Sequence, residues 1–131
     1  MSAKLLKLII PGTLAILLVA CAQPVYNVNN SPISASAVNY DLSDVTKAIN
    51  RAGAQFGWQM KEASPGHIVA TLHLRKHVAV VDITYTLGDF SINYKSSSNL
   101  IYDPSNNTIH KNYNGWIQNL SGAIDTQLSL L

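Results

Sequence analysis

Residues 67–95 read HIVATLHLRKHVAVVDITYTLGDFSINYK, and apolar and polar side chains alternate along them in three successive runs. An alternation with a period of two places the apolar side chains on one face of a β-strand and the polar ones on the other. The runs are separated by Arg75-Lys76-His77 and by Leu87-Gly88-Asp89, which are short polar or glycine-containing segments typical of hairpin turns. The sequence therefore predicts three antiparallel strands that share one apolar face.

The segment ahead of these runs predicts one helix and one more strand. Apolar residues recur at helical spacing between Val45 and Phe56, so we expect a helix over residues 43–55 with Ser43 as its N-cap. Side chains then alternate over residues 58–61, ahead of the turn signal Ser64-Pro65-Gly66, which indicates a short strand. A helix with one apolar stripe must cover another apolar surface, and the predicted sheet offers one.

The segment after the three runs predicts a loop and a second helix. Residues 96–107 are rich in Ser and Asn and are expected to form a loop. Apolar residues from Tyr113 to Leu131 recur at helical spacing, with Asn112 or a neighbouring polar residue as the expected N-cap. The predicted fold is therefore α+β, with the order α-β-β-β-β-α. It is a two-layer domain over residues 41–131, whose four-stranded antiparallel meander sheet carries the N-terminal and the C-terminal helix on one face.

The first twenty residues have the pattern of a secretion signal. Lys4 and Lys7 give the start of the chain a positive charge, and an apolar run follows from Leu8 to Ala20. This run is shorter than the about 20 apolar residues that a membrane-spanning helix needs, and Pro11-Gly12 interrupts it. The sequence therefore predicts a signal peptide over residues 1–20.

Leu18-Val19-Ala20-Cys21 resembles the lipobox of bacterial lipoproteins, in which diacylglycerol is attached to the cysteine thiol before the signal peptidase cuts ahead of it. The resemblance implies that Cys21 is lipidated and that the mature protein is held in a membrane. Ala22 stands where an aspartate would retain such a lipoprotein at the inner membrane, so the resemblance implies the periplasmic face of the outer membrane. Cys21 is the one cysteine of the chain, which excludes an intramolecular disulfide.

Residues 22–39 contain mostly Asn, Ser, Ala and Pro and carry no charge. This composition favours a flexible tether, so residues 21–40 are interpreted as the lipidated cysteine and a linker. The alternative is an ordered arm in which Val25, Tyr26 and Ile33 pack on the domain.

A second resemblance lies at the start of the C-terminal helix. Residues 109–120 read IHKNYNGWIQNL, and their Tyr-Asn-x-Trp-Ile-x-Asn-Leu pattern resembles the terminal helix of small, largely uncharacterised proteobacterial lipoproteins. The resemblance implies a compact periplasmic α+β domain and brings no assigned catalytic residues.

The charge balance excludes one class of partner. The nine Lys and Arg residues include Lys4 and Lys7, so seven basic residues face seven acidic ones after residue 20. A nucleic-acid-binding protein would carry a basic patch, and none is indicated.

Histidines suggest a metal site as one alternative. His73 and His77 flank the predicted hairpin tip and could approach each other, with Asp82 as an oxygen ligand, to form a weak copper or zinc site. The simpler interpretation is that both are solvated residues of the polar face and the turn.

The sequence carries no catalytic signature. It has no Gly-x-Ser-x-Gly, no His-Glu-x-x-His and no glycine-rich phosphate loop, and lipidation would consume its one thiol. We therefore expect a protein without enzyme activity and without a cofactor. An accessory role for a cell-wall hydrolase is the lesser alternative.

The polar face of the predicted sheet is the main candidate for binding. Its low charge and its Thr, Val and Asn content suit a surface that binds a protein or a glycan. The candidate binding residues are Thr71, His73, Asp82, Thr84 and Asn93. An edge strand could also pair with a strand of a partner. The sequence thus predicts an outer-membrane lipoprotein that binds another envelope component, most plausibly a protein, and it leaves the oligomeric state open.

Overall fold

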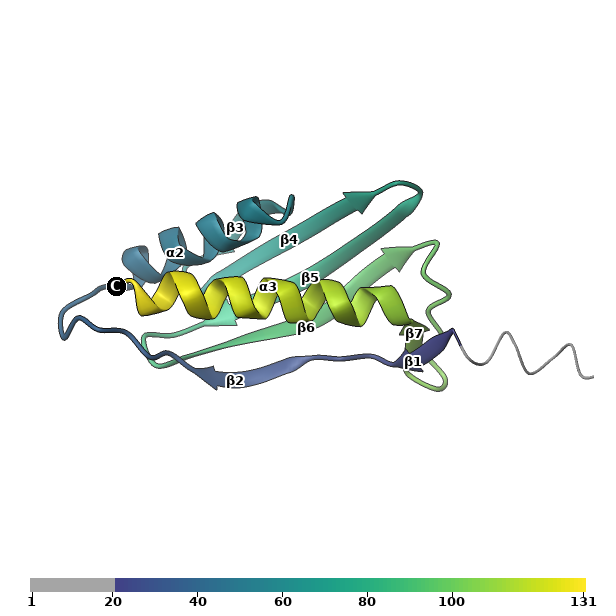
Figure 1. Cartoon of the computed structure of the whole chain (residues 1–131), viewed down its shortest axis with the longest axis horizontal. Coiled ribbons are helices and arrows are strands. Elements are labelled where there is room, and N and C mark those ends of the chain that lie inside the picture. The colour runs from purple at the N-terminus through teal and green to yellow at the C-terminus, as the bar shows by residue number, and fades with distance from the viewer. Residues whose placement is uncertain (1–20) are drawn as a thin grey trace, which may run out of the picture.

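The structure is a computed structural model that describes residues 21–131 as one α+β arrangement (Figure 1). The predicted signal peptide, residues 1–20, lies outside the described residues. The strands are β1 (Ala22–Pro24), β2 (Val28–Pro32), β3 (Gln59–Ser64), β4 (His67–Leu74), β5 (His77–Tyr85), β6 (Asp89–Ser98) and β7 (Thr108–His110). The helices are α2 (Leu42–Gln55) and α3 (Lys111–Ser129). Within residues 21–131, no helix is long and apolar enough to cross a membrane.

The main sheet has five strands in the order β2-β6-β5-β4-β3, and each neighbouring pair is antiparallel. The predicted α+β class, the two helices and the hairpins from β3 to β6 are confirmed. The predicted number of four strands is wrong, because β2, which precedes both helices, adds to the free edge of β6. Strands β1 and β7 form a separate two-stranded sheet that the sequence did not indicate.

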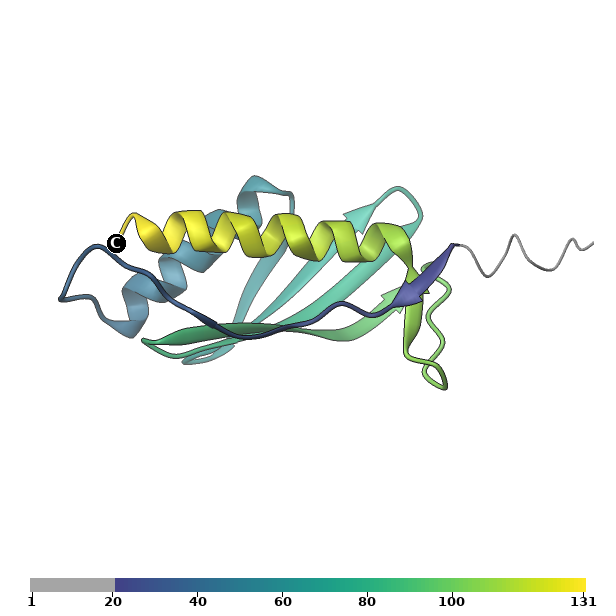
Figure 2. The same ribbon diagram turned by 60° about the horizontal axis from the view of Figure 1, so that its bottom comes forward.

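Helices α2 and α3 cover the same face of the main sheet, and within residues 21–131 the other face carries no helix (Figure 2). The covered face holds the apolar residues of the alternating runs, as predicted. The core combines Val45, Ile49 and Ala52 of α2, Ile68, Val81, Ile83 and Ile92 of the sheet, and Ile117, Leu120 and Ile124 of α3, all of them buried. Each large aliphatic side chain in such a core contributes roughly 1.5–3 kcal/mol to stability through burial.

The turn between β4 and β5 is shorter than predicted. Leu74 pairs with His77, so the turn contains Arg75 and Lys76 alone rather than three residues. Arg75 adopts a positive φ of 56°, which lets the chain reverse within two residues. This turn sets the pairing along the whole hairpin and places Asp82 opposite Val69.

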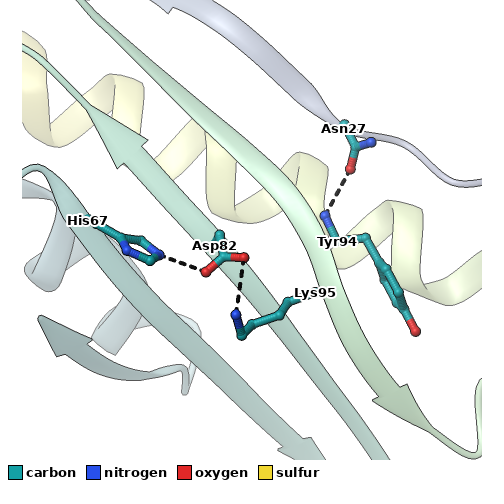
Figure 3. Close-up of polar contacts among 5 residues, drawn as sticks. All are labelled: Asn27, His67, Asp82, Tyr94 and Lys95. Atoms are coloured by element: carbon teal, nitrogen blue, oxygen red, sulfur yellow. Dashed lines mark hydrogen bonds and ion pairs between the residues drawn. The ribbon is translucent and has the colours of Figure 1, made fainter. Parts of the chain in front are cut away.

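The predicted tether is wrong for residues 22–24 and 28–32, which form β1 and β2. The ordered-arm alternative holds for Val25 and Ile33, which pack against the core, whereas the side chain of Tyr26 is 40% exposed. The asparagines that suggested disorder serve as hydrogen-bond partners. Asn27 Oδ1 accepts from the Tyr94 N–H at 3.0 Å (Figure 3), and Asn30 Oδ1 accepts from the Ser91 hydroxyl at 3.4 Å.

The helix ends and the last loop also differ in detail from the prediction. The N-cap of α2 is Asp41 rather than Ser43, and Asp41 and Asp44 form a reciprocal capping box. The N-cap of α3 is His110, whose Nδ1 accepts from the Asn112 N–H. The predicted loop at residues 96–107 begins later, because β6 continues to Ser98.

Tyr113 is fully buried among aromatic rings. The ring of Tyr94 stands edge-on to it, with a centroid distance of 5.8 Å, and stacks at 4.2 Å on Tyr102. The Tyr113 hydroxyl has no hydrogen-bond partner among the described residues. Burial, with a smaller contribution from Tyr94, raises the pKa of Tyr113 above the usual range of a phenol.

We expect Tyr113→Phe to raise the free energy of unfolding by about 1 kcal/mol, because it removes a buried polar group that has no partner. Urea denaturation of the two proteins measures the difference. The matched control is Tyr85→Phe, which removes a buried hydroxyl that does bond, to Thr46 Oγ1 at 2.6 Å, and should lower the same quantity by about 1 kcal/mol. If both variants lose stability equally, the Tyr113 hydroxyl is hydrogen-bonded in solution and the interpretation is wrong.

Candidate functional site

The candidate site is the face of the main sheet opposite the one that α2 and α3 cover, here called the open face (Figure 2). All five predicted binding residues lie on it: Thr71, His73, Asp82, Thr84 and Asn93. The strand register shows this, because Asp82 stands between Val69 and Asn93, whereas the next residue, Ile83, is buried between Ile68 and Ile92 on the helix side.

Asp82 occupies the middle of this face and contacts two basic side chains (Figure 3). The Nε2–H of His67 donates to Asp82 Oδ1 at 2.7 Å, and Lys95 Nζ lies 3.6 Å from Asp82 Oδ2. The three side chains come from β4, β5 and β6, and they are 33%, 26% and 49% exposed, respectively. The open face thus carries a carboxylate held between an imidazole and an ammonium group.

Strand β6 contains a β-bulge at Lys95. Val80 pairs with Ser96 and Val81 pairs with Tyr94, so Lys95 is an extra residue in β6. A bulge of this kind breaks the strict alternation and redirects a side chain. Lys95 shares the open face with Asn93 by alternation and lies beside Asp82, and the bulge places the next residue, Ser96, on that face as well, opposite Val80.

His67 and Lys95 were not among the predicted binding residues. His67 was expected on the polar face, but nothing indicated that Asp82 would lie beside it. The length of the β4–β5 turn would have predicted this contact. If the turn is taken as Arg75 and Lys76 alone, counting outward pairs His67 with Thr84 and Val69 with Asp82, which makes His67 and Asp82 diagonal neighbours. The bulge at Lys95 has no comparable signal in the sequence.

Apolar side chains lie between these polar groups. Val69, Val78 and Val80 are each partly exposed on the open face, opposite Asp82, His73 and Thr71, respectively. A centre of partly exposed apolar side chains with polar and charged groups around it is typical of surfaces that bind proteins. The arrangement offers hydrogen-bond donors and acceptors of both charges in fixed positions.

The structure does not bring His73 and His77 together. By strand alternation His73 belongs to the open face, whereas His77 lies on the helix side, with its ring centroid 6.1 Å from that of Trp116. Asp82, the predicted oxygen ligand, bonds to His67 instead. Within residues 21–131, no three His, Cys, Asp or Glu side chains are grouped in a way that could hold a metal ion.

His77 has a different histidine as its neighbour, with the ring of His110 at a centroid distance of 6.2 Å. Each ring uses Nδ1 in a structural hydrogen bond. His77 Nδ1–H donates to the Asn99 carbonyl at 2.6 Å, and His110 Nδ1 accepts from the Asn112 N–H at 3.1 Å. A neutral His110 ring therefore keeps its proton on Nε2, which prevents that nitrogen from binding a metal while the helix cap is intact.

Comparison with protein-family models, with curated proteins and with solved structures gave no match. The function therefore has to be argued from the residues of the chain.

We expect Asp82→Asn to change the free energy of unfolding by less than about 1 kcal/mol, because hydrogen-bonded and ion pairs that remain partly exposed contribute little to stability. Ile83→Ala is the matched control on the next residue of β5, and its side chain faces the core, so it should cost about 2–5 kcal/mol. Urea denaturation measures both. A loss of several kcal/mol in Asp82→Asn would mean that the Asp82 contacts serve the fold rather than a surface function.

Proposed function

We propose that the mature chain is a lipoprotein held in the outer membrane through Cys21, and that its domain is a non-enzymatic binding module for another envelope component. The lipobox pattern of residues 18–21 supports the anchor. The position of Cys21 is compatible with it, because the residue is exposed at the start of β1 and its carbonyl accepts from the Lys111 N–H at 3.0 Å. A lipid on Cys21 would therefore extend from the surface of the folded domain.

The open face supports the binding role, and the observation that carries it is the set of contacts around Asp82. His67 and Lys95 hold the carboxylate in one position before any partner arrives. The strands that carry these side chains pair along eight residues in each hairpin, so the backbone beneath them is also fixed. Binding to a surface that is already ordered loses less conformational entropy, which favours specific recognition.

A protein is the partner that this surface fits best. The valines of the open face can be buried against apolar side chains of a partner, while Asp82, His67 and Lys95 can exchange hydrogen bonds with its polar groups. The edges of the sheet are less suitable for strand addition. Both edge strands, β2 and β3, contain a register shift, and β2 also ends in Pro32, which cannot donate a backbone hydrogen bond.

The anchor is tested by the mass of the N-terminal peptide of the protein purified from bacterial envelopes. We expect the mature chain to begin at Cys21 and to carry covalently bound acyl chains. Cys21→Ala should keep residues 1–20 and carry no lipid. An unmodified N-terminus in the unsubstituted protein would contradict the anchor.

The binding face is tested by crosslinking in intact envelopes. We expect one stoichiometric partner to be recovered with the unsubstituted protein and its yield to fall about tenfold or more in Val80→Lys, since a lysine placed among the valines would have to be buried in the interface. Ala54→Lys places the same charge on an exposed position of α2 and should leave the yield unchanged. Equal recovery with both variants would contradict a role for the open face.

A further inference from the structure

The residue that would carry the lipid lies at one end of the sheet, together with the β4–β5 turn. The backbone N–H of Lys111, the first residue of α3, donates a hydrogen bond to the Cys21 carbonyl, and Ala22 pairs with His110 in the β1–β7 sheet. The ring of His110 in turn neighbours that of His77, which follows the turn directly. Figure 1 shows β1, the start of α3 and the tip of the β4–β5 hairpin at the same end of the molecule.

The loop after β6 belongs to this end as well. The side-chain amide of Asn99 donates to the Lys76 carbonyl at 2.7 Å, and the Asn99 carbonyl accepts from His77. We call this part of the domain the anchor end. It comprises Cys21, residues 74–77, residues 99–101 and the first turn of α3.

The anchor end is positively charged. Arg75, Lys76 and Lys111 are all exposed there, and the first turn of α3 contains no acidic residue. A lysine at the start of a helix lies in the unfavourable, positive part of the helix dipole, so an external anion would be stabilised at this position. The acid nearest in the chain is Asp103, two residues after Ile101, and hydrogen bonds from Asn106 and Ser105 lower the pKa of its carboxyl, so one negative charge stands against the three bases.

Exposed apolar side chains stand among these charges. Leu74, next to the turn, is 43% exposed, and Ile101, in the loop after β6, is 57% exposed. Apolar side chains flanked by basic ones are typical of protein surfaces that rest in the interfacial region of a bilayer.

Charge distinguishes this end from the opposite one. At the opposite end, Leu87 is 48% exposed, but its neighbours are acids. Asp89 follows in the same turn. The Tyr40 hydroxyl donates to the Leu87 carbonyl, and Asp41 is the next residue after Tyr40. An anionic surface would repel the acids at the opposite end, whereas it would attract the bases at the anchor end.

We propose that the anchor end binds the anionic surface of the bilayer that holds the lipid, with Arg75, Lys76 and Lys111 on the headgroups and Leu74 and Ile101 at the acyl boundary. This inference rests on the proposed lipidation of Cys21. Since β1 begins at Ala22, the lipid leaves no linker that could keep the domain away from the membrane. Each basic side chain near an anionic surface strengthens the association by about fivefold.

The orientation has a consequence for the open face. Strands β4, β5 and β6 run from the anchor end to the opposite end (Figure 1), so they would point away from the bilayer. At about 3.3 Å per residue, β5 would extend roughly 30 Å from the surface. The open face would then stand upright and be accessible from the side.

The test uses the lipoprotein purified from envelopes and reconstituted into vesicles of phosphatidylcholine, with or without phosphatidylglycerol. Hydrogen exchange is measured for residues 74–77 and 99–101. We expect exchange there to slow about fivefold or more when the anionic lipid is present. The effect should disappear in Arg75→Glu/Lys76→Glu and persist in Lys47→Glu/Lys61→Glu, which makes the same change in net charge at exposed positions away from this end. Leu74→Ser should weaken it more than Leu87→Ser.

Equal exchange on both kinds of vesicle, or equal effects of the two charge-reversed pairs, would overturn the inference. The mass of the same preparation reports lipidation separately. If it shows no lipid, the proposed anchor fails, and the inference is then decided by sedimentation of that unlipidated protein with phosphatidylglycerol vesicles. Binding that high salt abolishes would support the anionic surface, and absence of binding at low salt would overturn it.

Discussion

The pairing of Leu74 with His77 across the two-residue turn is the constraint on which the rest of the structure depends. It places Val81 and Ile83 under the helices and Asp82 in the open. A slip of one residue in the pairing would exchange the two faces of one strand, exposing isoleucine and valine and burying a carboxylate that had lost its partners. Such a slip would cost several kcal/mol, so the register is strongly specified. The contact of His67 with Asp82 exists only in this register.

The alternation of side chains predicted correctly which residues of each strand share a face, because that grouping depends only on the strand itself. It could not predict which residues stand opposite each other, because that depends on the turn. A turn with Arg75 at positive φ has no glycine or asparagine to mark it, so the tip appeared to include His77. With that error His73 and His77 seemed close, whereas the structure places their rings on opposite faces of the sheet and His67 beside Asp82. The helices, which depend on periodicity within one segment, were predicted to within about two residues of the ends that the structure has.

The prediction of a flexible tether after Cys21 was wrong for a different reason. Composition measures how much apolar surface a segment can bury, and residues 22–39 have little of it. Their order comes instead from hydrogen bonds to partners far away in the chain. Asn27 accepts from the backbone of Tyr94, Asn30 donates its backbone N–H to Ser91, and β1 pairs with β7. These contacts join residues more than sixty positions apart, and no property of the segment alone would indicate them.

The order of the residues that follow Cys21 bears on the kind of partner that the domain could reach. A linker of this length would let the domain search a wide volume, whereas β1, paired directly after Cys21, would hold it beside any lipid on that residue. With the proposed lipid on Cys21, attachment at a fixed place and orientation would restrict the partner to one that approaches from the side, close to the membrane. The same attachment would also raise the effective concentration of the open face for a partner anchored in the same bilayer, since less translational and rotational freedom would remain to be lost. The open face, with three partly exposed valines and the hydrogen-bonded Asp82 carboxylate, would then support a stable complex even if its own interface were weak. In this proposal, the pairing of β1 directly after Cys21 would compensate for the small area of the open face by fixing its position beside the membrane.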